Sequence, residues 1–399
     1  MSIRELLKVL TNVVIVLFLA FTILPVKLNY SSMAIIGLLV LALGNFFYER
    51  QGLVQHKSFL LIMIAPLLIY LLGLLNTQNL DSGFSFVTRN LSFIAFPIIF
   101  IGVGNMVQKS FVLKAYVILV VIIDLYLAYL FVYYFNFGER FYMIIQHEIY
   151  HSTYLGMFNL FAFWISVLAF RKHQTKRNAA IAIFFIICAI ITASRIVFLL
   201  SFVSLIISIV FLIQSRTKRL FLVLAAVAIT LSTLFYAPGL KQKFKQLVEI
   251  SKIGFDQNNY ESISSRFGKL EASANIIKKN SLFGTGTGDL TDELVLEYKR
   301  MNFTMGYKYK YNPHNQILSN LARNGFLGGG LCLISIFIWP AYISTIKKNV
   351  LLLAFIGVIF GVSLTESILD VHKGITFYTF FNSLLMYNLI IQSKKGKRL

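Results

Sequence analysis

Long apolar stretches separated by short polar segments run through most of the chain. About twelve of them have the roughly 17–25 residues that a helix needs to cross a bilayer. They lie near residues 8–25, 32–48, 58–75, 91–107, 112–135, 150–170, 178–194, 195–214, 219–236, 324–345, 349–366 and 374–392. These stretches lack the strict alternation of barrel strands. The pattern therefore predicts an all-α polytopic membrane protein, in which two helices abut near Ser194.

One long polar segment interrupts this pattern between the ninth and tenth stretches. It divides the chain into transmembrane helices 1–9 (1–236), a large loop with surface helices (237–323), and transmembrane helices 10–12 with a basic tail (324–399). Within the loop, apolar residues at helical spacing predict an amphipathic helix from Ser265 to about Asn280, lying on the membrane surface. Its expected apolar stripe is Phe267, Leu270, Ala274 and Ile277.

The composition excludes a soluble domain. The chain has 399 residues, of which 57% are hydrophobic and only 13% charged, against about 25% charged in soluble proteins. Its net charge of +21 lies largely in alternate short loops, which places both termini in the cytoplasm and the 237–323 loop outside. Basic residues in such loops fix the orientation of the helices and contact anionic lipid headgroups, so the charge gives no reason to expect nucleic-acid binding. Cys188 and Cys332 lie within predicted spans and form no disulfide framework or metal spacing.

Two arginines on the predicted outer face stand at helix starts. Arg195 follows Ser194, and Arg266 follows Ser264 and Ser265, each serine being a suitable helix cap. A cation there opposes the helix dipole at a cost of roughly 0.3–1 kcal/mol. Together with free N–H groups, however, it forms an anion site. The alternative is an interfacial arginine that reaches the lipid headgroups.

His314 is the main candidate for acid–base chemistry. Asn312 can cap a helix and Pro313 suits its first position, which places His314 in the first turn. The dipole there disfavours imidazolium, so we expect a neutral histidine that accepts a proton. The alternative is a structural histidine.

Other polar residues share the predicted outer face. The segment from Gly284 to Asp289 lacks the lysine of a P-loop, and its Gly286 and Gly288 form either a turn or a close backbone approach to a polar ligand. His147, Glu148 and His151 lie in the loop entering the sixth span, but no third ligand spacing indicates a metal. We expect His151 to contact sugar hydroxyls or neighbouring residues at the rim. Tyr307, Tyr309 and Tyr311 offer flat faces for sugar rings or an interfacial belt.

The spacing His314-Asn315-x9-Gly325-x2-Gly328 resembles the signature of the bacterial O-antigen ligase and polymerase superfamily. Further similarities are Ser194-Arg195 at a span end, Arg266 ahead of a helix that leads into Gly284-x-Gly286-x-Gly288, and the turn that contains Glu366. The twelve-span layout with its long loop also fits this family.

The resemblance implies a metal-independent glycosyltransferase of the C type, without a cofactor, on the periplasmic face of the bacterial inner membrane. Such enzymes move a glycan from undecaprenyl diphosphate to an acceptor hydroxyl. The acceptor is lipid A-core in ligases, which we favour, and another lipid-linked glycan in polymerases. By motif position, Arg195 and Arg266 would hold the diphosphate, and His314 would be the general base. We further expect Asn315, Gly286, Gly288, His151 and Glu366 to contribute to substrate binding. A lipid-linked-sugar transporter is the remaining alternative, but no repeat between the two halves of the chain supports it.

Overall fold

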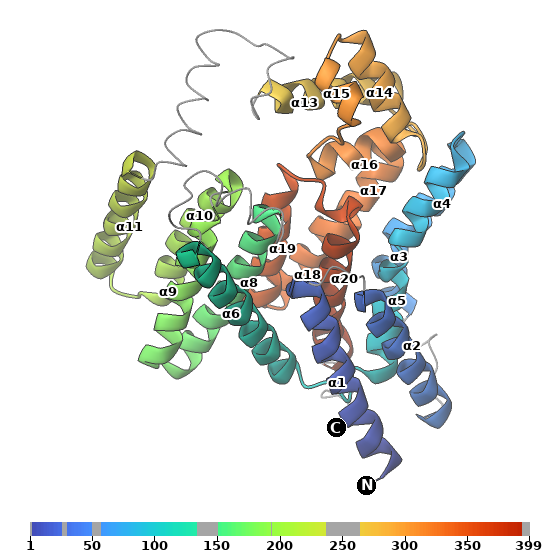
Figure 1. Cartoon of the computed structure of the whole chain (residues 1–399). Coiled ribbons are helices and arrows are strands. Elements are labelled where there is room, and N and C mark those ends of the chain that lie inside the picture. The colour runs from blue at the N-terminus through green and yellow to red at the C-terminus, as the bar shows by residue number, and fades with distance from the viewer. Residues whose placement is uncertain are drawn as a thin grey trace.

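A computed structural model describes residues 2–25, 30–49, 57–133, 151–192, 194–236 and 264–392. Within these ranges the regular secondary structure is helical (Figure 1). Eight of the described helical segments are long and apolar enough to cross a membrane, and Val350–Ser363 is a shorter apolar helix. The prediction of an all-α polytopic membrane protein is thus confirmed. The count of about twelve spans and the division at residues 236 and 323 stay predictions.

Every predicted span corresponds to one helix or to a run of consecutive helical segments. The bundle consists of α1 (Ile3–Ile23), α2 (Tyr30–Glu49), α3 (Lys57–Leu72), α4 (Leu80–Arg89), α5 (Ser92–Val103), α6 (Lys109–Tyr133), α8 (Ser152–His173), α9 (Lys176–Ile191), α10 (Arg195–Leu212), α11 (Arg216–Tyr236), α17 (Gly330–Leu333), α18 (Trp339–Ile346), α19 (Val350–Ser363) and α20 (His372–Tyr387). Short 3-10 turns extend α3 (Gly73–Asn76) and precede α20 (Ile368–Asp370). The predicted abutment near Ser194 is confirmed, because α9 ends at Ile191 and α10 begins at Arg195.

Aromatic side chains fill the centre of the bundle. The Phe161 ring packs against Phe355 and Phe381, with centroids 4.8 and 4.9 Å apart. The Tyr116 hydroxyl donates to the Phe158 carbonyl at 2.8 Å, which leaves this buried polar group paired. These contacts join α6, α8, α19 and α20 into one packed unit. The ends of α8 and α19 are therefore fixed relative to each other.

Four shorter helices form a cap at one end of the bundle: α13 (Ser264–Lys279), α14 (Leu290–Arg300), α15 (Thr304–Tyr309) and α16 (Gln316–Asn324). Figure 1 shows α13–α15 at the end of the molecule opposite the start of α1. The cap has a small apolar core of its own: Ala272, Ile276, Ile277, Leu290, Leu294, Tyr298, Phe303 and Ala322. From α16 the chain continues through a π-helical turn (Gly325–Gly329) into α17.

The buried face of α13 differs from the predicted stripe. The helix and its bounds were predicted correctly, but Phe267 is 52% exposed, whereas Lys269, Ala272, Ser273 and Ile276 are buried. The face is rotated because α13 packs against α14–α16, where tertiary contacts bury polar residues such as Lys269. The expected orientation of α13 on a membrane surface stays a prediction.

The glycine-rich segment after α13 ties the cap to α3 and α4. Gly284 and Gly286 adopt positive φ angles of 72° and 101°, which glycine tolerates without strain. The N–H of Gly286 donates to the Arg323 carbonyl at 2.9 Å, and that of Gly288 donates to the Thr77 hydroxyl at 3.3 Å. A Cβ atom at Gly288 would meet the Asn79 carbonyl oxygen. These glycines therefore allow close packing between segments that lie far apart in the sequence.

Candidate functional site

Three predicted site residues from distant parts of the chain converge on a fourth, Glu366. His314 Nδ1 lies 2.9 Å from Glu366 Oε2. The Arg266 guanidinium lies 3.7 Å from Oε1, and His151 Nε2 lies 4.0 Å from the same oxygen. We call these four residues the Glu366 cluster. The Glu366 side chain is 10% exposed, whereas His314 is 29% and Arg266 39% exposed. The carboxylate is thus covered, and the groups around it are open to a substrate.

His314 sits just before α16 and not in its first turn, so that prediction was wrong. The helix begins at Gln316, and Asn315 is its cap, accepting from the N–H groups of Ile317 and Leu318 at 2.9 and 3.1 Å. Asn312 instead accepts from the His314 N–H at 3.0 Å in a local turn. This turn gives His314 a φ of +48°, which is uncommon outside glycine and recurs at functional sites.

The segment that carries Glu366 is fastened to α16 at both ends. Before Glu366, the Asn315 side chain donates to the Leu364 carbonyl at 3.0 Å. After it, Arg323 makes a two-pronged ion pair with Asp370, at 3.2 and 3.1 Å. The Ser319 hydroxyl donates to the same carboxylate at 2.6 Å. Because α16 follows directly on His314, these bonds set the distance between His314 and Glu366.

Asp370→Asn should lower the stability of the protein and loosen the Glu366 cluster. Arg323 is 6% exposed, so the substitution leaves a buried cation without its partner, at an expected cost of about 3 kcal/mol. Thermal unfolding in detergent measures this as a lower midpoint.

The double variant Asp370→Asn, Arg323→Met supplies the control, because it removes both charges. It should recover much of the lost stability. An unchanged midpoint in the single variant would show that the pair does not hold the segment.

The surroundings of Glu366 keep it ionised. Burial raises the pKa of this carboxyl, but the His314 hydrogen bond and the nearby His314, His151 and Arg266 outweigh that effect and lower the pKa overall. An ionised carboxylate only accepts hydrogen bonds, so Nδ1 of His314 must be the donor. In the neutral imidazole, Nε2 then carries the lone pair. A histidine whose Nδ1–H is held by a carboxylate and whose Nε2 carries the lone pair has the arrangement of a general base.

Lys269 adds a second cation that our sequence analysis missed. It lies one turn after Arg266 on α13, and its ammonium sits 4.0 Å above the Tyr311 ring. Burial, together with the charge of Arg266, lowers the pKa of Lys269 to about 8, although Glu366 acts in the opposite direction. The sequence did not indicate that Lys269 is buried, because a lysine in an amphipathic helix is ordinarily exposed to solvent.

Arg195 begins α10, as predicted, and lies beside the start of α8. Ser194 occupies the cap position, but its hydroxyl pairs with Thr153 at 3.1 Å and makes no capping bond to the helix. This bond joins the start of α10 to the start of α8, which follows His151. Arg195 is therefore on the same rim as the Glu366 cluster.

The glycine-rich segment does not offer its backbone as we expected. The N–H groups of Gly286 and Gly288 are already bonded to protein atoms, so a ligand cannot use them while this packing persists. His147 and Glu148 lie outside the described residues. Within the described residues, no group of three or more His, Cys, Asp and Glu side chains is arranged to hold a metal ion.

Comparison with known proteins adds a family to this geometry. Residues 180–333 match the model of a family described as O-Antigen ligase. This segment belongs to the O-antigen ligase superfamily. No curated protein sequence matched the chain. The matched segment contains Arg195, Arg266 and His314, whereas His151 and Glu366 lie outside it.

The family match of residues 180–333 indicates the general activity. The protein is a multi-pass bacterial membrane protein and an enzyme of the ligase or polymerase type. Its substrates are, in general terms, a lipid-linked glycan and an acceptor. Within the described residues, a histidine, a carboxylate and an arginine meet in the Glu366 cluster. This cluster is therefore the candidate site for the chemistry of an O-antigen ligase-type enzyme.

Proposed function

We propose that the protein is an O-antigen ligase that transfers a glycan from undecaprenyl diphosphate to a hydroxyl of lipid A-core. The convergence of His314, Arg266 and His151 on Glu366 is the observation that carries this proposal. A transferase of this kind needs a base for the acceptor and cations for the leaving diphosphate. The cluster supplies both kinds of group side by side.

The diphosphate of the donor would bind to the cations of the cap and of α10. Arg266 offers a planar fork of N–H groups that suits phosphate oxygens. Lys269 adds a point charge one turn away, and Arg195 adds another guanidinium at the rim. The attraction between these cations and the diphosphate is strongest as the bond to the sugar breaks, because negative charge then develops on the leaving phosphate.

The acceptor would be activated by His314. Nε2 takes the proton of the acceptor hydroxyl as its oxygen bonds to the anomeric carbon of the donor sugar. The bond between that carbon and the diphosphate oxygen breaks, and undecaprenyl diphosphate leaves with the electron pair. Glu366 holds the Nδ1–H and stabilises the imidazolium that forms. No metal or cofactor enters these steps.

We further propose that the reaction occurs on the periplasmic face, with both termini in the cytoplasm. The support is the excess of basic residues in alternate short loops, together with the position of the cap at the end opposite the start of α1 (Figure 1).

Deleting the gene in its host, and restoring it on a plasmid, tests the proposal. A ligase predicts an intact lipid A-core without any attached polymer. Single repeat units on the core would instead indicate a polymerase, and unchanged surface glycan would contradict both. Purified protein mixed with lipid-linked glycan and acceptor should then form the product without an energy source.

Donor affinity should fall as the pH rises through about 8. In that range Lys269, whose pKa lies near 8, loses its proton and its attraction for diphosphate. Binding of the lipid-linked donor, titrated between pH 7 and 9.5, measures the effect. Lys269→Arg should remove this step, because arginine stays charged, and Lys269→Met should lower affinity even at pH 7.

Folding stability provides the control for this titration. The pKa of Lys269 is lower when folded than when unfolded, so the unfolded chain binds more protons between about pH 8 and 10.5. This group therefore makes the fold more stable, not less, as the pH rises there. Weaker binding with an undiminished unfolding midpoint supports the proposal, and a pH step that persists in Lys269→Arg contradicts it.

A further inference from the structure

A large cavity lies at the other end of the bundle, between α6, α8, α9 and α19, with a volume of about 1440 Å³. It exceeds the roughly 300–1,000 Å³ of sites for drug-sized molecules. Six cationic side chains line it: Lys109, Lys114, Arg171, Lys172, Arg177 and Lys348. We call it the basic cavity.

The basic cavity is separated from the Glu366 cluster by the thickness of a membrane. Helix α8 starts after His151 and ends at His173, which lines the cavity; its 22 residues span about 33 Å. Helix α19 starts at Val350, in the cavity wall, and ends shortly before Glu366. The two sites are thus at opposite faces of the bilayer and are independent of each other.

The cavity has an uncompensated positive charge. Among its described lining residues there is no aspartate or glutamate. Helices α6, α9 and α19 begin here, whereas α8 and α10 end here, so their dipoles largely offset one another and the positive charge comes from the side chains. The six cationic side chains repel one another, and a bound anion relieves that repulsion.

The walls of the cavity below the cations are apolar. Leu113 and Val117 of α6, Ile165 of α8 and Phe211 of α10 line it. The Arg171 guanidinium lies 3.9 Å from the centre of the Phe211 ring. Such stacking fixes its plane and leaves its N–H groups available at the edge. An occupant therefore needs an anionic head for the rim and hydrocarbon for the walls.

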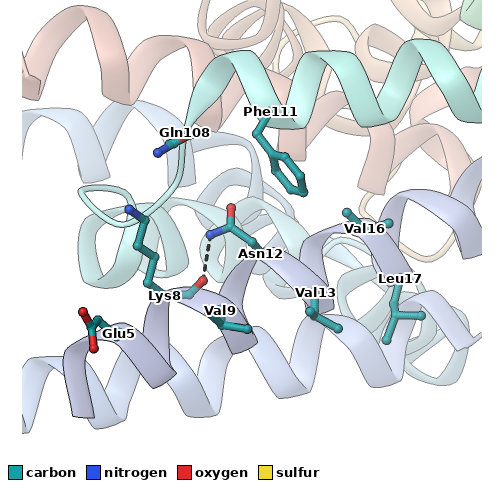
Figure 2. A pocket seen from close by; sticks show the side chains of 9 residues that line it. All are labelled: Glu5, Lys8, Val9, Asn12, Val13, Val16, Leu17, Gln108 and Phe111. Carbon is teal, nitrogen blue, oxygen red and sulfur yellow. Dashed lines mark hydrogen bonds between the residues drawn. The ribbon is translucent and has the colours of Figure 1, made fainter. Parts of the chain in front are cut away.

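A neighbouring cavity lacks these features. It lies between α1 and α6, where Phe111 points toward the side chains of α1 (Figure 2). Its charged lining residues are Lys8 and Glu5, of opposite sign. Two cavities at the same end of the protein thus differ in charge although both have apolar walls.

We propose that the basic cavity binds an anionic phospholipid, with its phosphate at the cationic rim and its acyl chains along the apolar walls. Basic pockets between transmembrane helices recognise anionic headgroups in this way. By the distribution of basic loops, the lipid would come from the cytoplasmic leaflet. The lipid would tie α6, α8, α9 and α19 together at the face opposite the Glu366 cluster.

The test compares two triple variants of the full-length protein. Lys114→Gln, Lys172→Gln, Lys348→Gln removes three exposed cations from the rim. The matched control, Lys8→Gln, Lys218→Gln, Lys347→Gln, removes three lysines at the same end of the bundle that do not line the basic cavity. Each protein is placed in phosphatidylcholine nanodiscs with increasing phosphatidylglycerol. Bound phosphatidylglycerol is counted by native mass spectrometry, and the unfolding midpoint is recorded.

We expect wild type and control to retain phosphatidylglycerol and to unfold at higher temperature as its fraction rises. The rim variant should bind it on the order of a hundredfold more weakly, since each of the three lysines near an anionic headgroup contributes roughly a fivefold factor. Equal retention by the rim and control variants would overturn the proposal. Displacement of the lipid by millimolar inorganic phosphate or pyrophosphate would also overturn it, because the site would then hold a free anion. If the rim variant does not fold, the single variant Lys114→Gln is compared with Lys347→Gln in the same way.

Discussion

His314→Ala and Glu366→Gln should each lower the rate of glycan transfer by about 10³-fold or more. Alanine removes the group that takes the acceptor proton. Glutamine keeps the shape of Glu366 but offers Nδ1 a neutral partner, so the histidine loses its fixed tautomer and the stabilisation of its imidazolium. Initial rates with purified protein, lipid-linked donor and acceptor measure both effects.

Combining the two substitutions distinguishes a working pair from two separate effects. Residues that act as a unit are strongly non-additive, so the double variant should be little slower than His314→Ala alone. Glu271→Gln is the matched control, because this glutamate is exposed on α13 and lies outside the cluster. Near wild-type transfer by Glu366→Gln, with the fold intact, would remove the carboxylate from the mechanism.

Arg266→Ala should lower transfer by about 10²–10³-fold, the range found when one charge-stabilising donor is removed. Arg266→Lys should restore little of this loss. Lysine keeps the positive charge but lacks the planar fork that grips two phosphate oxygens. Transfer rates and donor affinity, measured for both variants, separate binding from stabilisation of the leaving group.

Arg300→Lys is the matched control for this prediction. Arg300 lies on α14, pairs with Glu297 at 2.8 Å and does not belong to the Glu366 cluster. A lysine there should leave transfer unchanged. Full activity in Arg266→Lys would show that charge alone suffices at this position, and full activity in Arg266→Ala would exclude it from diphosphate binding.

The helices of this protein could be predicted from sequence because each depends on its own residues. Apolar length marks the spans, and Arg266 and Lys279 lie at the start and end of α13 as expected. The start of α16 could not be chosen in this way, since Asn312 and Asn315 are both good caps. A distant contact decides it: only Asn315 also reaches the Leu364 carbonyl.

Some residues of the site could also be predicted from local sequence, but the contacts between them could not. Motif spacing pointed to His314 and Arg266 and, more weakly, to Glu366, but not to their common contact. The role of Lys269 depends on Tyr311 lying beneath it, and that of Arg323 on a carboxylate 47 positions away. Neither pairing follows a periodic pattern that could be recognised in the sequence. The prediction for the glycine-rich segment failed similarly, because two of its partners, Tyr70 on α3 and Thr77 just before α4, are more than 200 positions distant.

The order in which the cluster's residues are synthesised has a consequence for biogenesis. His151, Arg266 and His314 emerge from the ribosome before α19 is made, and Glu366 follows that helix. A partly inserted chain thus already displays its cations and imidazole yet lacks the anion that arranges them. If the cluster is the active site, catalytic competence would then arrive only with the hairpin of α19 and α20, so that chains terminated before it remain inert in the membrane.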